Sequence, residues 1–201
     1  NICNLGSFYD NYMQVTTTDD SIKTAADLKG KAMVTLPRGN TTELGARALL
    51  KAAGLSYEQL GKINFASISD GVNMMKDGQV DVMLTITSVP NGSLLALTNS
   101  RKVRFLPITD EQFAAMKQQN AGWGRLTIPA NSYPNQTEDV HIAGFPAHLS
   151  LSCDTVSEDT AYKVTKALIK RGTELGTIVR SLSTLNAKTM ANDIGVPFHP
   201  G

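Results

Sequence analysis

The chain has 201 residues, of which 41% are hydrophobic and 18% are charged, and its formal net charge at pH 7 is +1. This hydrophobic content is enough for a packed core, so the composition argues against a disordered chain. Lysine and arginine are dispersed and form no basic run, which argues against a nucleic-acid partner. No apolar run approaches the ~20 residues that span a bilayer, so direct membrane insertion is not expected.

The most informative segment of the chain is residues 21–55, whose sequence predicts a strand, a loop and a helix in that order. After a short lead-in helix that ends at Gly30, residues 32–35 are expected to form a buried strand. Residues 36–41 then form a loop that leads to a helix over residues 42–53. This order of elements is the one that builds an anion site above the end of a strand.

The start of this helix has the features of such a site. Asn40 or Thr41 can cap it, Glu43 lies in the first turn, where the helix dipole favours a carboxylate, and Gly54 closes it. The unpaired N–H groups of a helix start attract a carboxylate or a phosphate. We therefore expect an anion or ordered waters at the Thr41 and Thr42 amides. The alternative is an ordinary strand-to-helix turn covered by solvent.

Apolar runs and helical periodicity alternate up to residue 107. The strands are expected at residues 32–35, 63–66, 80–85 and 103–107, and the helices between them at residues 42–53, 69–76 and 89–99. This alternation predicts a doubly wound α/β unit, whose right-handed crossovers bring the loops after the strands to one edge. Residues 36–41, 67–69 and 85–88 are therefore the predicted binding edge. Ser69 is expected to cap the second helix of the series.

The rest of the chain is extended and then helical rather than alternating. Residues 12–17 and 149–153 read as strands. Ser157 and the two acidic residues after it predict a helix that runs to about Arg171. Residues 172–193 are helical in composition.

The side chains that carry metal or redox chemistry are few. Cys3 and Cys153 allow one intramolecular pairing, but both lie in apolar extended segments, so we expect two buried thiols, with a disulfide as the alternative. The three histidines lack the i, i+4 spacing of a zinc site on a helix, so no metal is expected. No nucleophile elbow, phosphate-binding loop or dinucleotide motif occurs. We therefore expect neither a cofactor nor catalytic residues.

Six blocks of the sequence resemble one family of transport receptors and occur in that family's order. They are DLKGK with the loop GNTTE at residues 39–43, AAGL (52–55), KDGQVD (76–81), VPN (89–91), IPANSYPNQTEDV (128–140) and VPFHPG (196–201). On these blocks the chain is similar to the TAXI subfamily of solute receptors, which serve tripartite ATP-independent periplasmic (TRAP) transporters. The family's own N-terminal region, with a glycine-rich strand and helix, is absent from this sequence.

The resemblance implies a fold and a domain organisation. The fold would be the α/β type II periplasmic-binding-protein fold, whose two lobes close on a ligand. Residues 1–28 would be a crossover strand with a partial first lobe, and residues 29–108 the second lobe. Residues 109–201 would return to the hinge and complete the first lobe with C-terminal helices. The chain would thus hold the second lobe and the C-terminal part of the first.

The resemblance also implies a function without chemistry. The protein would be a periplasmic solute-binding subunit that captures a small carboxylate-bearing solute, such as a glutamate-like amino acid or a dicarboxylate, for delivery to a TRAP membrane permease. Two alternatives from other classes stay open. The ligand-sensing domain of a LysR-type transcription regulator has the same fold class and about this length. An α/β enzyme would need a nucleophile and a base brought together from distant segments.

Four of the candidate ligand contacts lie at helix starts. Thr41 and Thr42 match the loop with which the family holds a carboxylate, and Thr42 keeps the family's threonine. Asn40 and Thr41 replace a serine and a glycine of the family, which narrows the site and adds a hydroxyl. Thr87 and Ser88 stand where the family often has alanine and glycine, so this second helix start is also more polar.

Two further candidates are a cation and an aromatic ring. Arg38 is the cation nearest to the anion loop and can pair with a carboxylate, or it can be a solvated surface arginine. Tyr133 can stack over a ligand or hydrogen-bond to it from the rim of a cleft, or it can anchor a packed loop.

Overall fold

The computed structural model describes residues 1–201, which divide into two compact units. Unit 1 consists of residues 1–11 and 145–201, and unit 2 consists of residues 12–144. The boundaries that we expected at residues 28 and 108 both lie inside unit 2. One reason is that the helix α4 (Asp110–Gln119), which follows the second of these boundaries, packs against α1 (Thr41–Ala52) of the same unit.

A seven-stranded sheet has the order β3-β2-β4-β1-β7-β6, and β5 pairs with β1 off this path. The strands β2, β3 and β4 pair in parallel, whereas β1 runs antiparallel to β4. The strands are β1 (Ile2–Thr17), β2 (Ala32–Thr35), β3 (Lys62–Phe65), β4 (Val82–Thr87), β5 (Arg104–Phe105), β6 (Gly124–Ile128) and β7 (Val140–Ser152). Both β1 and β7 begin in one unit and end in the other.

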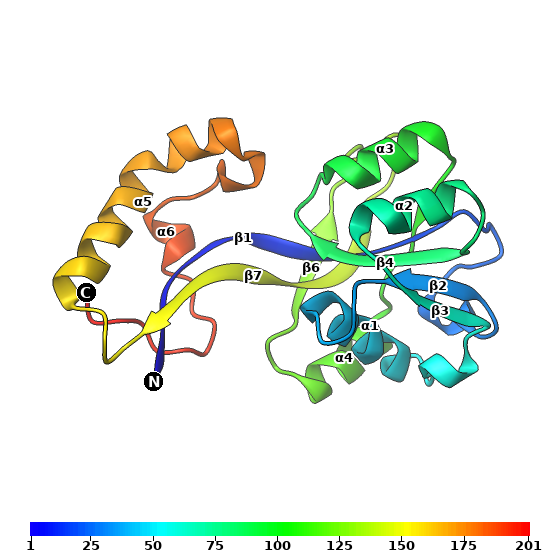
Figure 1. The fold of residues 1–201 in the computed structure, drawn as a ribbon, viewed down its shortest axis with the longest axis horizontal. Coiled ribbons are helices and arrows are strands. Elements are labelled where there is room, and N and C mark those ends of the chain that lie inside the picture. Colours follow the sequence, from blue (N-terminus) through cyan, green and yellow to red (C-terminus); the bar gives the residue numbers. More distant parts are fainter. The chain divides into compact units, whose positions relative to one another are not determined.

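The helices of unit 2 cover both faces of the sheet (Figure 1). The helices α2 (Ile68–Lys76) and α3 (Gly92–Ser100) lie on one face, and α1 and α4 lie on the other. Accordingly, Gly71 of α2 lies close to the Met83 side chain, while Gly45 of α1 faces Ile86, which points to the opposite side of β4. The two layers bury an apolar core that includes Met13, Leu49, Met75, Leu84 and Leu94.

The parallel strands confirm the predicted α/β pattern in unit 2. The strand β2 has the predicted bounds, and α1 starts one residue earlier than expected because Asn40, rather than Thr41, is its cap. The helix α2 is capped by Ser67, whose side chain accepts from the Asp70 N–H, so the expected cap at Ser69 was wrong. The strand β5 is only two residues long, because it pairs with β1 only at Thr16 and Thr17.

Unit 1 contains α5 (Glu158–Ile178), which Ser157 caps as predicted, and the short helix α6 (Ala187–Met190). Cys3 and Cys153 form a disulfide with an S–S distance of 2.10 Å, so the expected pair of free thiols was wrong. The reason is strand pairing. The Cys153 N–H donates to the Asn1 carbonyl at 3.2 Å, which brings the two cysteines to a Cα separation of 5.3 Å.

Candidate functional site

The loops after β2, β3 and β4 form a switch point in the sheet. β2 lies between β3 and β4, and its loop leads to α1 on one face, whereas the loops after β3 and β4 lead to α2 and α3 on the other face (Figure 1). In open α/β sheets, ligands bind outside the carboxyl ends of strands where the connections diverge in this way. We call residues 36–40 and 87–91, which lie at the carboxyl ends of the neighbouring strands β2 and β4, the switch-point loops.

The first switch-point loop ends in a capped helix. The Asn40 side chain accepts from the Thr42 N–H at 2.8 Å, so one of the two amides that we expected to face an anion already has a partner within the chain. The Thr42 side chain is only 3% exposed, whereas Thr41 is exposed. Of the two predicted contacts at the start of α1, Thr41 is therefore the one that lies at the surface.

A carboxylate of the protein itself lies against this loop. Glu43 is 0% exposed, and its carboxylate accepts from the Gly39 N–H at 3.2 Å and from the Tyr57 hydroxyl at 3.0 Å. Arg47 completes the set with a hydrogen bond of 3.1 Å and an ion-pair distance of 3.0 Å. Burial raises the pKa of a carboxyl group, but these hydrogen bonds outweigh it and hold the pKa of Glu43 below its usual range. Burial and the neighbouring Glu43 carboxylate raise the pKa of Tyr57.

The predicted cation Arg38 is exposed and lies over two aromatic rings. Its guanidinium carbon is 4.8 Å from the centroid of Phe65, at the end of β3, and 6.0 Å from that of Tyr57. Such cation–π contacts hold the guanidinium in place without neutralising its charge. Arg38 forms none of the direct ion pairs of the structure. Glu58 is nevertheless close enough that, after the hydrogen bonds of its carboxylate with Ser56 and with its own backbone, the charge of Arg38 also lowers its pKa. A positive charge is thus held near the start of α1.

The second switch-point loop carries Thr87 and Ser88, which are both partly exposed. The Thr87 hydroxyl accepts from the Asn91 side-chain amide at 3.2 Å. The other end of the Asn91 side chain caps α3 by accepting from the Ser93 N–H at 3.0 Å and from the Leu94 N–H at 3.3 Å. Asn91 therefore fixes both the loop and the helix start, a role that its place before an apolar helical run indicates but that our sequence reasoning missed.

Tyr133 anchors this loop from behind. It is 2% exposed, its ring stacks on Phe105 with centroids 4.7 Å apart, and burial raises its pKa to about 12. The hydroxyl donates to Gln14 Oε1 at 2.6 Å and accepts from the Asn91 N–H at 2.8 Å. The packed loop anchor, which was the alternative for Tyr133, therefore describes this residue. A buried ring with both hydroxyl roles filled is not available for stacking on a ligand.

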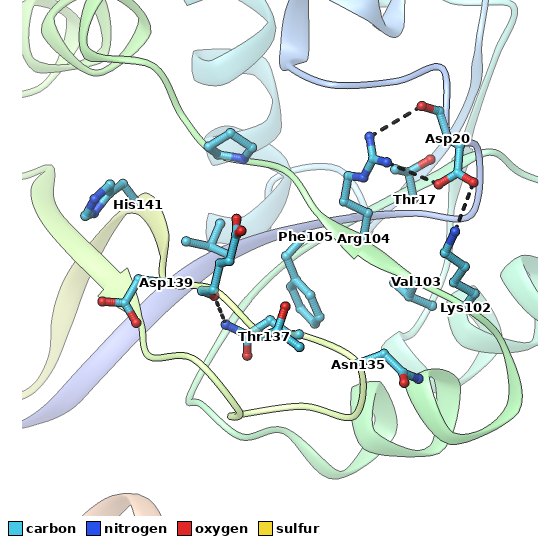
Figure 2. Close-up of a pocket in the computed structure, with 14 residues that line it drawn as sticks. Thr17, Asp20, Lys102, Val103, Arg104, Phe105, Asn135, Thr137, Asp139 and His141 are labelled. Atoms are coloured by element: carbon cyan, nitrogen blue, oxygen red, sulfur yellow. Dashed lines mark hydrogen bonds and ion pairs between the residues drawn. The ribbon is translucent and has the colours of Figure 1, made fainter.

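A separate hollow of about 390 Å³ has Thr17, Phe105 and His141 among its lining residues (Figure 2). Thr17, on its wall, pairs with Val82 at the start of β4, whereas the switch-point loop follows Thr87 at the end of that strand. On the rim, Asp20 lies 3.2 Å from both Lys102 and Arg104, so these two cations share one acidic partner. The switch-point loops are the stronger candidate, because they lie where the connections of the sheet diverge and Arg38 forms no direct ion pair.

No group of three or more His, Cys, Asp or Glu side chains is arranged to hold a metal ion. None of the helices combines the length and the apolar character that crossing a membrane requires.

Comparisons with known proteins identify the family and the fold. The model of the NMT1-like family matches residues 1–201. An ancestral arginine-binding protein bound to glutamine is 19% identical, with a TM-score of 0.51 over 91% of this chain and 64% of that one. A putative L-cystine ABC transporter protein from Listeria monocytogenes is 15% identical, with a TM-score of 0.51 over 92% of this chain and 65% of that one.

A third similar structure is the periplasmic aliphatic sulphonate binding protein SsuA from Escherichia coli, which is 16% identical with a TM-score of 0.44. This chain covers 47% of SsuA, with 90% of its own residues aligned. At such identities the likeness concerns the fold alone, and the fold is the α/β fold of these binding proteins. The chain spans less than two thirds of the length of each of the three structures.

Proposed function

The chain belongs to the NMT1-like family, and from this premise we propose that it is part of a solute-binding protein that captures a small carboxylate-bearing molecule for a membrane transporter. The fold supports the capture of a ligand without chemistry, because solute-binding proteins hold a ligand between lobes and release it unchanged. The proposed ligand is a glutamate-like amino acid or a dicarboxylate.

The single observation that carries this proposal is the position of Arg38. The guanidinium lies over Phe65, near the start of α1, and it forms no direct ion pair, although its charge acts on the nearby Glu58. A planar guanidinium can bind a carboxylate with two parallel hydrogen bonds. Thr41, three residues after Arg38, is the exposed first residue of α1 and supplies a hydroxyl group. The start of α1 adds the positive end of the helix dipole.

The second switch-point loop supplies the other polar groups of the proposed site. Thr87 ends β4, the strand next to β2, and Ser88 follows it, so they extend the site across the switch point. Thr42 and Tyr133, which we expected among the contacts, are buried and would act through the backbone that they support. The proposed contacts of this unit are therefore Arg38, Thr41, Thr87 and Ser88.

The compartment and the transporter partner that we propose follow from the resemblance to TAXI receptors. We propose the periplasm as the compartment and the membrane permease of a TRAP transporter as the partner. A disulfide such as Cys3–Cys153 persists in an oxidising compartment, which supports the periplasm. The alternative of a LysR-type regulator gains no support from the family match.

Calorimetric titration of the full gene product tests the proposal. The probes are L-glutamate, succinate and the neutral amide L-glutamine. Saturable binding of glutamate or succinate, weakened when Arg38 is replaced by Gln, is the expected result. Binding that is indifferent to Arg38, or no binding of any carboxylate, would contradict the proposed site or the proposed ligand class respectively.

A further inference from the structure

We infer that Gln14 and Tyr133 are positioning residues that set the backbone of the loop at residues 87–91 for ligand binding. This inference rests on the proposed function, because it deepens the account of the same site. Neither residue belongs to the loop. Gln14 lies in β1 and Tyr133 in the segment between β6 and β7, and they are 0% and 2% exposed. Both act from behind the loop, where no ligand reaches them.

The two side chains form hydrogen bonds with three polar groups of the loop backbone. Gln14 Nε2 donates to the carbonyl oxygens of Thr87 and Ser88, each at 3.3 Å. The Tyr133 hydroxyl accepts from the Asn91 N–H at 2.8 Å and donates to Gln14 Oε1 at 2.6 Å. Because an amide has its acceptor at one end and its donors at the other, the Tyr133 hydroxyl turns the donor end of Gln14 toward the loop.

This arrangement decides which way the loop peptides face. The only cis peptide bond of the chain is Val89–Pro90, so the bond between Ser88 and Val89 is trans. In a trans peptide the carbonyl and the N–H of one unit point in opposite directions. Since the Ser88 carbonyl points at Gln14, the Val89 N–H points away from it, on the side of the loop that Gln14 and Tyr133 leave open. The Val89 N–H is thus a further candidate donor to a carboxylate.

We call the hydrogen bonds of Gln14 and Tyr133 to this loop the clamp. The clamp also reduces the free-energy cost of ligand binding. A loop whose carbonyls are already held inward does not have to be ordered by the ligand. If these hydrogen bonds were lost, the partly buried Asn91 N–H and the two carbonyls would find other partners, and the loop would adopt several conformations. The affinity would then fall without the loss of any group that touches the ligand.

Two nearly isosteric variants and one control separate positioning from stability. Gln14→Glu replaces the donor end by an oxygen that repels the Thr87 and Ser88 carbonyls. Tyr133→Phe keeps the ring on Phe105 and removes only the hydroxyl. The control, Thr16→Val, removes the buried hydrogen bond from β1 to the Met83 carbonyl, which does not involve the loop.

The experiment combines glutamate titration calorimetry with amide hydrogen exchange measured by NMR on the full gene product. Both positioning variants are expected to bind glutamate about tenfold more weakly, which corresponds to the loss of one or two net hydrogen bonds. In Tyr133→Phe the Asn91 N–H is also expected to exchange faster. Thr16→Val should lower the unfolding midpoint and leave both the affinity for glutamate and the exchange rate of the Asn91 N–H unchanged.

Wild-type affinity in a folded Tyr133→Phe variant would overturn the inference. Unchanged exchange at Asn91 would also overturn it, and this reading does not depend on any ligand. If the wild type binds no carboxylate, the proposed function fails, while the exchange measurement still decides whether the clamp orders the loop. Where Gln14→Glu does not fold, Tyr133→Phe decides alone, because it leaves the ring packing intact.

Discussion

The carboxylate of Glu43 accepts a hydrogen bond from the N–H of Gly39 at 3.2 Å. The loop that precedes α1 is therefore held by an anion of the protein itself. Arg47 neutralises this anion from within α1, and Arg38, which lies over Phe65, forms no direct ion pair with it. The Glu43–Arg47 ion pair of α1 thus fixes the shape of the loop. Arg38, within the loop, is the exposed cation that can bind a ligand.

Replacing Glu43 by Gln is expected to lower the free energy of unfolding by about 1–3 kcal/mol, because a buried set of charge-assisted hydrogen bonds is weakened. The pKa of Glu43 is lowered in the folded protein from its ordinary value of 4.5. Its contribution to stability is thus complete above that ordinary value and is lost as the pH falls through the folded pKa. Urea unfolding should show a difference between wild type and variant that narrows in acid. A difference that stays constant with pH would contradict this account.

Replacing Gly45 by Ala is expected to destabilise unit 2. A Cβ atom there would lie 2.6 Å from Ile86 Cδ1, 3.0 Å from Met13 Cε and 3.2 Å from Trp123 Cη2. Overpacking of a core costs about 1–3 kcal/mol, but these atoms are side-chain ends that can shift, and the Gly→Ala change itself gains about 0.4–1 kcal/mol, so we expect a net loss at the low end of this range by thermal or urea unfolding. Gly92→Ala is the matched control, because a Cβ at Gly92 meets no atom within 4 Å, and it should stabilise by about 0.4–1 kcal/mol. Equal effects of the two variants would refute the packing argument.

The disulfide between Cys3 and Cys153 is expected to stabilise unit 1. It closes a loop over a sequence separation of 150 residues, and losing a native disulfide costs about 2–5 kcal/mol. The double variant Cys3→Ser, Cys153→Ser should therefore unfold at lower denaturant concentration. Mass spectrometry after alkylation without a reductant should find no modified cysteine in the wild type. Two alkylated cysteines would show that the thiols are free.

Replacing Arg38 by Gln is expected to weaken carboxylate binding ten- to a hundredfold, since hydrogen bonds to charged groups contribute about 1.5–3 kcal/mol. Stability should hardly change, because the side chain is exposed and its ring contacts contribute little at the surface. Lys51→Gln, which removes an exposed positive charge from the other end of α1, is the control and should leave binding unchanged. Titration calorimetry and thermal unfolding of both variants check this prediction. Equal losses of affinity in both would point to a general electrostatic effect.

The parallel part of the fold was predictable because its signals are local. The strand at residues 32–35 has a continuous apolar run, and Asn40, Gly54 and Ser157 mark the ends of helices. The helix α4 was missed because it buries only Gln112 and Met116 and so lacks a clear apolar stripe. Its capping box, with Thr109 at the cap and Gln112 three residues later, was the available signal.

The parts of the site that escaped prediction depend on contacts between distant residues. Gln14 reaches Tyr133 across 119 positions of sequence, and nothing in a polar residue within a strand indicates such a partner. The pairing of Cys3 with Cys153 likewise depends on the ends of two strands that lie far apart in the chain. Local patterns indicated where the switch point lies, but not which of its residues are buried.

The most direct test of the central claim, that the switch-point loops bind a carboxylate, is an NMR titration of the full gene product with L-glutamate, read at the backbone amides. The account predicts saturable shifts at Arg38, Thr41, Ser88 and Val89, with little change in the hollow beside Phe105. Saturable shifts confined to that hollow, or no shift at either switch-point loop, would contradict it.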